Sequence, residues 1–515
     1  NNPFFGEQRG GQRPQFTISQ EAVQEFQVVT FGAPAEFGRS SGGFVNVVTK
    51  SGTNQFHGAG FFFFRDQSLT SQNQDAIKAM LPTDDFSNYQ FGGNLGGPIK
   101  RDKAFFFVAY DQNKGDSTKP NNVDPRLVQI FATRFNSPNE QGQIKRTNTA
   151  NVFLGKVDLN IDPRNILSLR YNYSRATQTN GTFDVPTWAR SANGRETSNT
   201  NSIVSQLVTV ISPTVLNEFR FQFAREARPR FYDGPDLPDT TIGTFAGDTS
   251  FRFGQPFFLP TALVDRRFQV TNNLSLIKGN HSFKFGADIN YVRVFQNFQG
   301  FARGRYIFAA PTIDAAIQGF LDYIDRKNVN ALALYLQFAP LGNRTRDQAG
   351  TQVVKQLEPA VYAQDFWKIK QNLIISYGFR WEGQFEPDPI SGVNETRYSQ
   401  FINDPRFPSD GTIPDFTDGY QPRFGFAYDP TKDGKTVIRG SSGIFYARIP
   451  GLELAGPRNT DGVISGNIFF ANVLAAPPTN VPIAAFPIYP GIISTQGFVP
   501  FNPGVRVFDK NFNNP

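Results

Sequence analysis

From Ala35 to Arg65 the chain reads AEFGRSSGGFVNVVTKSGTNQFHGAGFFFFR, and two kinds of segment meet in this stretch. Residues 40–43 are small, and residues 44–49 are rich in β-branched side chains, which predicts a short strand. The run KSGTN that follows consists of turn formers, so it ends this strand. Residues 56–65 then read as a second strand, dense in phenylalanine. Since the rest of the chain resembles this second strand repeated in pairs, we expect the architecture to change just before residue 56.

Downstream of residue 56, apolar and polar residues alternate with a period of two. In residues 166–175, leucine and tyrosine occupy the odd positions from 167 to 173, and Ser, Arg and Asn occupy the positions between them. The same alternation returns in residues 219–223 and 282–291, and more loosely in 373–382. Successive side chains of a strand point to opposite faces of a sheet. The sequence therefore predicts strands with one apolar face and one polar face.

The connections between these strands also alternate, between short and long. Short turns join neighbouring strands as hairpins at residues 98–102, 162–165, 212–214, 278–281, 370–372 and 429–435. Long stretches separate the hairpins at residues 66–87, 112–149, 176–199, 226–265, 295–356 and 383–419. Short turns at one rim and long loops at the other are typical of a bacterial outer-membrane barrel, whose long loops are extracellular. Within the fifth long stretch, the apolar spacing predicts a helix over Ile313–Ile324.

About thirteen barrel strands can be counted, the first beginning at Phe56 and the last ending near Tyr446. A complete single-chain bacterial barrel has an even number of strands, and plugged transporters have about 22. The chain starts at Asn1 without a visible signal peptide. We therefore expect an all-β fold, an antiparallel transmembrane β-barrel of which about thirteen of about 22 strands are present, in a chain that is a fragment of a longer precursor.

Several segments of the chain carry a family resemblance: EAVQEFQVVT (residues 21–30), AEFGRSSGGFVNVVTKSGTN (35–54), FHG (56–58), GGNLGGPI (92–99), FFFVAYD (105–111), YAQDFWKIKQNLIISYGFRWE (362–382) and RGSSGIFY (439–446). Together they resemble TonB-dependent outer-membrane receptors, in particular their Oar-like branch, which carries an N-terminal carboxypeptidase-regulatory-like domain. The resemblance implies that residues 1–55 are the C-terminal part of a plug domain. It also implies that residues 56–515 are the N-terminal portion of an outer-membrane β-barrel with long extracellular loops.

The resemblance further implies a plug–barrel junction, made of Glu36, Gly38, Arg39, Gly42, Gly43, Asn46, Thr49, Lys50, Ser51 and Gly52. Glu36 and Arg39 are either ion pairs between plug and wall or two solvated charges. A protein of this family would lie in the outer membrane of a Gram-negative cell, in contact with lipid. It would take up a nutrient such as a siderophore, a glycan or a peptide, driven by the TonB complex acting on a segment upstream of Asn1. The residues that bind the substrate are not assigned.

No pattern in the sequence indicates an enzyme, a cofactor, a metal site or a nucleic-acid partner. The chain has no cysteine and only two histidines, His57 and His281, which lie far apart. The glycines before Lys50 lack the spacing of a phosphate-binding loop. The 51 basic and 44 acidic residues are interspersed, so the net charge of +7 forms no basic block. We expect both histidines near the rim with the short turns.

Two further sets of residues leave alternatives open. Asp365 is expected on the same face as Trp367, near the aromatic girdle of the short-turn rim, unless a bulge intervenes. Basic and aromatic residues of the long loops either contact substrate or pack the loops; they are Arg228, Arg230, Phe231, Tyr232, Phe301, Arg303, Arg305 and Tyr306.

Two other classes of protein compete with the transporter. One is a passive, adhesive or secretion-linked outer-membrane barrel, which would lack a TonB-contacting segment. The other is a soluble β-rich glycan-binding protein, whose apolar faces would be covered by a second sheet. The strict alternation of short and long connections argues against the soluble protein.

Overall fold

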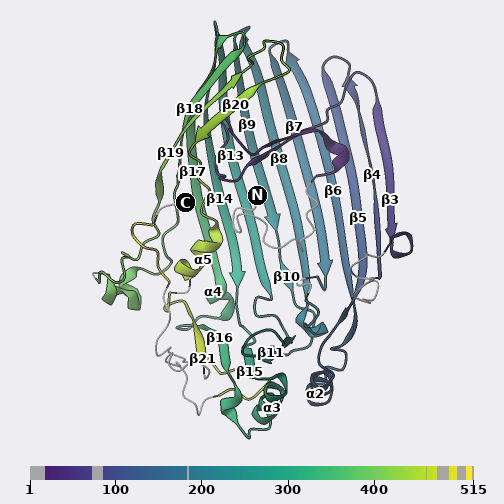
Figure 1. Cartoon of the computed structure of the whole chain (residues 1–515), viewed down its shortest axis with the longest axis vertical. Helices are drawn as coiled ribbons and strands as arrows, with labels where there is room; N and C mark the ends of the chain where they lie inside the picture. The colour runs from purple at the N-terminus through teal and green to yellow at the C-terminus, as the bar shows by residue number, and fades with distance from the viewer. Residues whose placement is uncertain are drawn as a thin grey trace.

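The computed structural model describes residues 18–71, 85–181, 185–402, 404–459, 461–471, 486–495 and 506–512. One antiparallel sheet dominates these residues, and its strands follow one another in chain order (Figure 1). Its long strands are β3 (His57–Asp66), β4 (Asp85–Lys100), β5 (Ala104–Asn121), β6 (Gly142–Asp162), β7 (Asn165–Thr179), β8 (Arg195–Ser212), β9 (Val215–Ala227), β13 (Thr261–Lys278), β14 (His281–Phe298), β17 (Thr351–Lys370), β18 (Leu373–Gln384), β19 (Phe416–Tyr428) and β20 (Ile438–Gly443). The two-residue β10 (Arg230–Phe231) pairs with β8 and β13, the neighbours of β9.

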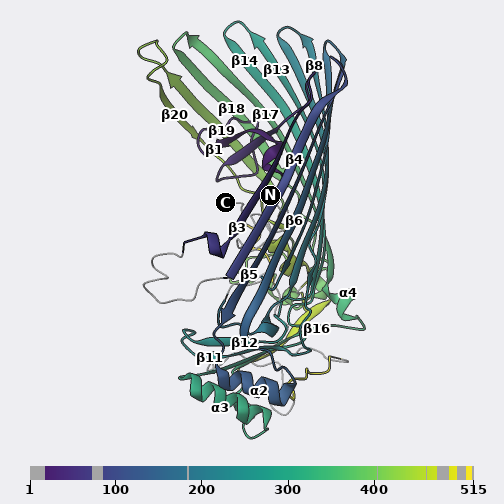
Figure 2. The ribbon, with the colours of Figure 1, turned by 90° about the vertical axis from the view of Figure 1, so that its right-hand side faces the viewer.

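This sheet curls into a trough, which we call the wall (Figure 2). Among the described residues its two edges are β3 and β20, which do not pair with each other. The short hairpin turns lie at the upper end in Figures 1 and 2, and the long connections lie at the lower end. The predicted partial antiparallel barrel is therefore confirmed, with its last strand ending at Gly443 rather than near Tyr446.

The outer face of the wall is apolar and exposed, whereas the inner face is polar. On β14, Phe285 and Ile289 are exposed, while Asn290, on the opposite face, is 2% exposed. The same parity places Leu169, Tyr171, Ile203, Phe219, Phe268, Val270, Val361 and Phe379 on the exposed face. Alternation of this kind suits a wall with lipid outside and a polar lumen inside.

The strands are longer than the sequence pattern predicted. Strand β6 has 21 residues and β17 has 20, whereas a strand crosses a bilayer with about 9–11 residues. The extra residues lie at the long-connection end, in stretches that we had assigned to loops. The wall therefore continues well past one membrane surface. Beyond that surface its strands are polar, so their sequence does not differ from that of a loop.

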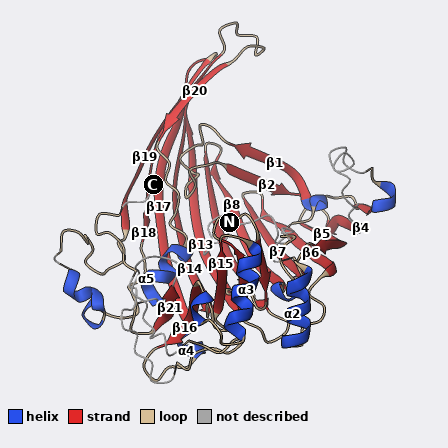
Figure 3. Cartoon of the chain, turned by 60° about the horizontal axis from the view of Figure 1, so that its bottom comes forward, coloured by secondary structure: helices blue, strands red, loops and turns tan. Residues whose placement is uncertain are grey.

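The long connections carry more secondary structure than the one helix that the sequence predicts. A five-stranded sheet of order β12-β11-β15-β16-β21 lies at the lower end of Figure 1, and it consists of β11 (Asp239–Thr244), β12 (Ser250–Phe253), β15 (Arg305–Ala310), β16 (Leu334–Pro340) and β21 (Ser465–Ala471). The helices are α2 (Pro125–Phe135), α3 (Ile313–Ile324), α4 (Arg346–Gly350) and α5 (Gly451–Asn459). Helix α3 has the predicted bounds, and Figure 3 shows it beside α2.

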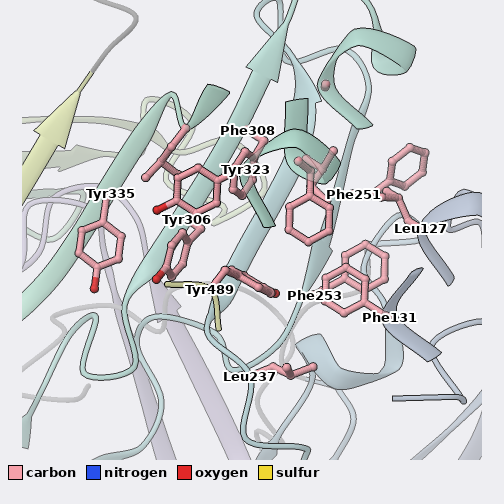
Figure 4. Close-up of a cluster of buried hydrophobic side chains, with 14 of the residues drawn as sticks. Leu127, Phe131, Leu237, Phe251, Phe253, Tyr306, Phe308, Tyr323, Tyr335 and Tyr489 are labelled. Carbon is pink, nitrogen blue, oxygen red and sulfur yellow. The ribbon is translucent and has the colours of Figure 1, made fainter. Parts of the chain in front are cut away.

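We call this sheet, with α2, α3 and their flanking loops, the loop cap. It has a hydrophobic core of its own, dominated by aromatic side chains (Figure 4). The Phe131 and Phe253 rings stack with centroids 4.0 Å apart, and Phe320 and Tyr489 meet edge to face at 5.3 Å. Because residues from five separate stretches share this core, the long connections hold one another in place.

Among the described residues, no helix has both the length and the apolar character needed to cross a membrane.

Inside the trough lies the N-terminal segment, residues 18–56 (Figure 2). It contains the 3-10 turn η1 (Gln20–Ala22) and a two-stranded antiparallel sheet of β1 (Val23–Val29) and β2 (Phe44–Thr49). The sequence of residues 18–26 is compatible with either a helical turn or the start of a strand, and the structure shows a turn followed by a strand. Residues 1–15 are polar and rich in Gly, Pro and Gln, which predicts a loop, but they lie outside the described residues. The connection from β1 to β2, residues 30–43, contacts the inner surface of β14, β17, β18 and β19.

Candidate functional site at the contact between the N-terminal segment and the wall

The connection between β1 and β2 bends twice to reach the wall. Gly32 and Arg39 have φ angles of 63° and 61°. A left-handed conformation is ordinary for glycine but uncommon for arginine. The left-handed conformation of Arg39 is held by four contacts with the wall, three made by the side chain and one by the backbone.

Arg39 joins three strands of the wall. Its Nη1 donates to Asp288 Oδ2 at 2.7 Å, and its Nη2 donates to the Glu358 carbonyl at 2.8 Å. Its Nε lies 3.0 Å from Glu358 Oε2, and its backbone N–H donates to Glu382 Oε1 at 3.2 Å. Burial alone would lower the pKa of Arg39, but the charges of Asp288 and Glu358 outweigh burial and raise the pKa. The guanidinium therefore stays charged, as a partly buried cation with paired anions should.

Arg380 meets the same segment from the wall side. It is 1% exposed, and its Nε donates to Glu382 Oε2 at 2.8 Å. Its Nη1 donates to the Ala35 carbonyl at 3.4 Å. Gly38 packs directly on this pair: a methyl group there would lie 2.2 Å from Arg380 Nε and 2.4 Å from Glu382 Oε2. Glycine at position 38 thus allows the backbone to approach the wall closely.

Further hydrogen bonds fix the remainder of the contact. The Ala35 N–H donates to Gln364 Oε1 at 2.7 Å, and Lys284 pairs with Glu36. Arg423 donates to the carbonyls of Ala33, at 3.2 Å, and of Pro34. Of the two readings left open by the sequence, Glu36 and Arg39 therefore form ion pairs with the wall.

The remaining predicted junction residues fall into two groups. Gly42, Gly43 and Asn46 lie away from the ion pairs: a methyl group at Gly42 would meet no atom within 4 Å, the Gly43 N–H approaches Ser40 Oγ at 3.5 Å, and Asn46 faces Gln27 in the small sheet.

Thr49 to Gly52 form the exit turn toward β3. Thr49 is buried, and Lys50 lies 3.6 Å from Glu21. Ser51 accepts a hydrogen bond from Lys156 at 2.6 Å. At Gly52 a methyl group would lie 2.2 Å from the Phe106 carbonyl oxygen, so this turn presses on the wall backbone.

Sequence reasoning missed the wall side of the site: Asp288, Glu358, Arg380, Glu382 and Arg423. Each occupies a polar-face position of a strand, where charged residues are ordinary. The signal that could have found them is the pairing of charges at such positions, since Arg380 and Glu382 are two residues apart on one face.

One carboxyl group next to this network, on its long-connection side, has an altered pKa. Glu386 follows β18 and accepts hydrogen bonds from Gln356 Nε2 at 3.0 and 3.2 Å. Burial, followed by the charges of Glu358 and Asp415, raises the pKa of Glu386 to about 8. Since Glu358 also binds Arg39 and Arg448, Glu386 lies next to the ion pairs of the site.

Asp365 does share a face with Trp367, because the pairing of β14 with β17 runs through both without a shift. Its carboxylate accepts from Tyr377 Oη at 2.8 Å and lies 2.6 Å from His281 Nδ1. The His281 ring also stacks on Trp367, with centroids 5.3 Å apart. Hydrogen bonding to these aromatic neighbours accounts for a carboxylate on the outer face of the short-turn rim. His57 begins β3 at the same rim.

The loop residues divide between packing and a cavity. Tyr306 is fully buried in the core of the loop cap. Arg303 and Arg305 pair with Asp236 and Asp239. Arg228, Arg230 and Phe301 line a cavity beneath the cap. Phe231 lies in β10 and stacks with Arg195, and the Tyr232 hydroxyl donates to the Pro235 carbonyl. Among the described residues, no group of three or more His, Cys, Asp and Glu side chains is placed to hold a metal ion.

The structure defines an outer-membrane β-barrel protein, because the wall has an apolar outer face and a polar inner face and encloses an inward-folded segment. Residues 48–128 and 111–515 match the family model described as "Outer membrane beta barrel domain". The chain belongs to this family and lies in the outer membrane of a Gram-negative cell.

Known proteins that resemble this chain include a curated relative and two solved structures. Over 114 residues, 21% of this chain and 10% of the relative, the sequence is 36% identical to the TonB-dependent transporter Oar of Myxococcus xanthus. The fold is similar to that of the outer membrane transporter YddB of Escherichia coli, with 13% identity, a TM-score of 0.53 and coverage of 85% of this chain and 50% of that one. The siderophore receptor PirA of Pseudomonas aeruginosa also matches, with 11% identity, a TM-score of 0.46 and coverage of 83% and 50%. The chain thus spans about half the length of these solved structures. The predicted resemblance to Oar-like receptors is confirmed.

Proposed function

We propose that this protein takes up a nutrient across the outer membrane, and that residues 18–55 belong to a plug that blocks the barrel until the TonB complex acts on it. The observation that carries the proposal is the ion-pair contact of Arg39. A purely structural wall needs no separate segment folded inside it. Here the segment is held by side-chain contacts with the wall, and it makes its own two-stranded sheet.

The type of contact also suits reversible movement. Hydrogen bonds and ion pairs between two polar surfaces can be exchanged for water when the surfaces separate, so opening does not expose a hydrophobic core. The contact between residues 33–39 and the wall consists mainly of such bonds. Released by a pull from the periplasm, the segment could leave a polar passage along the inner face of the wall.

The test is a growth screen on single nutrients in the native host, comparing wild type, a strain without this protein and a strain without TonB. The proposal expects at least one nutrient on which both deletions impair growth. If only the deletion of this protein has an effect, the barrel works passively or in secretion, and the proposal is wrong.

An engineered disulfide adds a direct test of plug movement. An ideal Cβ at Gly378 lies 3.2 Å from Ala35 Cβ, so a shift of a few tenths of an ångström would bring the pair into the disulfide range of about 3.5–4.5 Å. The chain has no cysteine of its own. The double variant Ala35→Cys/Gly378→Cys should lose uptake when oxidised and regain it when reduced, whereas each single variant should be insensitive to oxidation.

A further inference from the structure

A cavity lies at the long-connection end of the wall, beneath the loop cap. Its accessible volume is about 340 Å³, within the range of small-molecule sites. Strands β13, β14 and β17 supply one side of it, and β16, α5 and β21 supply the other; α5 lies beside the wall in Figure 3. The cavity is separate from the contact of Arg39 with the wall, because the two share no lining residue.

The lining combines an apolar side with positive charge. The apolar part includes four phenylalanines, Phe258, Phe298, Phe301 and Phe338. Three arginines also line the cavity, and none of its described lining residues is acidic.

The three arginines differ in how far their charge is already compensated. Arg228 is held by Asp265 at 2.9 Å. Arg230 lies 3.5 Å from Glu196, with its guanidinium 5.8 Å from the centre of the Phe258 ring. Arg506 reaches the cavity alongside α5, where a methyl group on Gly456 would come within 2.9 Å of its Cδ. The cavity thus favours an anionic group next to an apolar one.

Two buried amide oxygens at the cavity indicate that its ligand also carries a hydrogen-bond donor. Gln352 uses its Nε2 to donate to Gln296 Oε1 at 2.9 Å and to the Ala455 carbonyl at 3.3 Å, and Asn459 donates through Nδ2 to the Ala349 carbonyl at 2.9 Å. Within the described residues, Gln352 Oε1 and Asn459 Oδ1 have no hydrogen-bond donor. Both side chains are more than nine-tenths buried and line the cavity. Buried acceptors of this kind call for an N–H or O–H group from a ligand.

An apolar ring, a carboxylate and an amide N–H surround a single carbon atom, Cα, in an acylated aromatic amino acid, the group with which many peptides end. We propose that this cavity binds such a group, with its ring against the phenylalanines, its carboxylate at Arg506 and Arg230, and its N–H on the amide oxygens. The inference rests on the proposed function, since it names the class of compound that would be taken up.

The test is equilibrium dialysis of the protein, purified from outer membranes, against radiolabelled N-acetylphenylalanine. The free acid should bind at least tenfold more tightly than N-acetylphenylalaninamide, which lacks the charge, N-acetylalanine, which lacks the ring, and 3-phenylpropionate, which lacks the N–H. The tripeptide Ala-Ala-Phe separates the two sources of this group: tighter binding than the acylated amino acid indicates a peptide, and weaker binding indicates the single amino acid. Equal binding of the acid and its amide would overturn the proposal.

Variants locate the binding. Arg506→Gln and Arg230→Gln should each weaken binding about tenfold, and Ala455→Trp should abolish it by filling the cavity. Arg164→Gln, in a short turn at the opposite end, and Ala363→Trp, on the outer face, are matched controls that should bind as wild type does. Unchanged binding in Ala455→Trp and Arg506→Gln would overturn the proposal.

The two proposals fail separately in these assays. Binding without TonB-dependent uptake would contradict the transport function alone. TonB-dependent uptake of a nutrient that survives Ala455→Trp, together with no binding of N-acetylphenylalanine, would contradict the ligand alone.

Discussion

Replacing Gly38 by alanine should loosen the contact between the N-terminal segment and the wall. The added methyl group would lie 2.2 Å from Arg380 Nε, a distance at which one of the two must move. Arg380 has little freedom, since it is 1% exposed and bonded to Glu382 and to the Ala35 carbonyl. Displacing it disturbs Glu382, which also accepts the backbone N–H of Arg39.

The magnitude follows from the bonds at risk. Removing one partner of a buried ion pair costs about 3–5 kcal/mol. Here the pair is displaced rather than removed, so we expect the lower end, about 3 kcal/mol, for the free energy of opening the contact. A change of that size corresponds to roughly a hundredfold increase in the open population.

Hydrogen exchange of the backbone amides measures this population. The amides of Ala35 and Arg39 are bonded to the wall by Gln364 and Glu382, so they exchange only when the contact opens. In Gly38→Ala both should exchange roughly a hundredfold faster. Gly42→Ala is the matched control, since its methyl group would meet no atom within 4 Å. Equal exchange in the two variants would refute the reasoning.

Three further predictions concern charge and close packing. Because the pKa of Glu386 is raised to about 8, folding takes up a proton at any pH between the ordinary pKa of glutamate and 8. The contribution of Glu386 to the free energy of unfolding is therefore fully present at low pH and is lost as the pH rises through 8. In the wild type the melting temperature should therefore fall between pH 5 and pH 9, and in Glu386→Gln it should fall less. The corresponding loss in the free energy of unfolding is at most about 5 kcal/mol. An equal fall in the two proteins would contradict the prediction. Gly52→Ala should lower the yield of assembled barrel in a heat-modifiability gel, because its methyl group would lie 2.2 Å from a backbone oxygen. Gly60→Ala should assemble normally, because its methyl group would make only an ordinary contact at 3.8 Å; equal yields would refute the packing argument. Lys284→Gln should lower the free energy of opening the contact by only about 1 kcal/mol, because the side chains of Lys284 and Glu36 are both more than a quarter exposed. A decrease as large as that in Gly38→Ala would contradict this argument.

The sequence predicted the wall because a strand in a barrel obeys a local rule. Alternation with period two can be seen in any ten residues, and the turn at residues 278–281 needs only its own glycine and its neighbours. The helix over Ile313–Ile324 was predictable for the same reason, from its own apolar spacing. What the rule could not show is where the wall ends, because the polar alternation of β6 continues past the membrane without a change in composition.

The candidate site could be predicted only from its N-terminal half. Arg39 stands out because it lies in a glycine-rich junction. Its partners Asp288 and Glu358 lie 249 and 319 residues away along the chain, each on a strand whose polar face carries many similar residues. No local pattern distinguishes a lumen carboxylate that binds the segment from one that faces water. The loop cap was missed for a related reason, since its core gathers short pieces that are ordinary one by one.

The most direct test of plug movement is the accessibility of residue 35 in living cells. Ala35 is 1% exposed at the contact with the wall, and the chain has no native cysteine, so Ala35→Cys provides a single buried thiol. Cells are treated with a thiol-reactive maleimide while energised, with and without TonB. The account predicts labelling of this introduced thiol that depends on both TonB and the energy source, with little labelling when either is missing. Labelling that is equally slow, or equally fast, with and without TonB would contradict a plug that TonB moves.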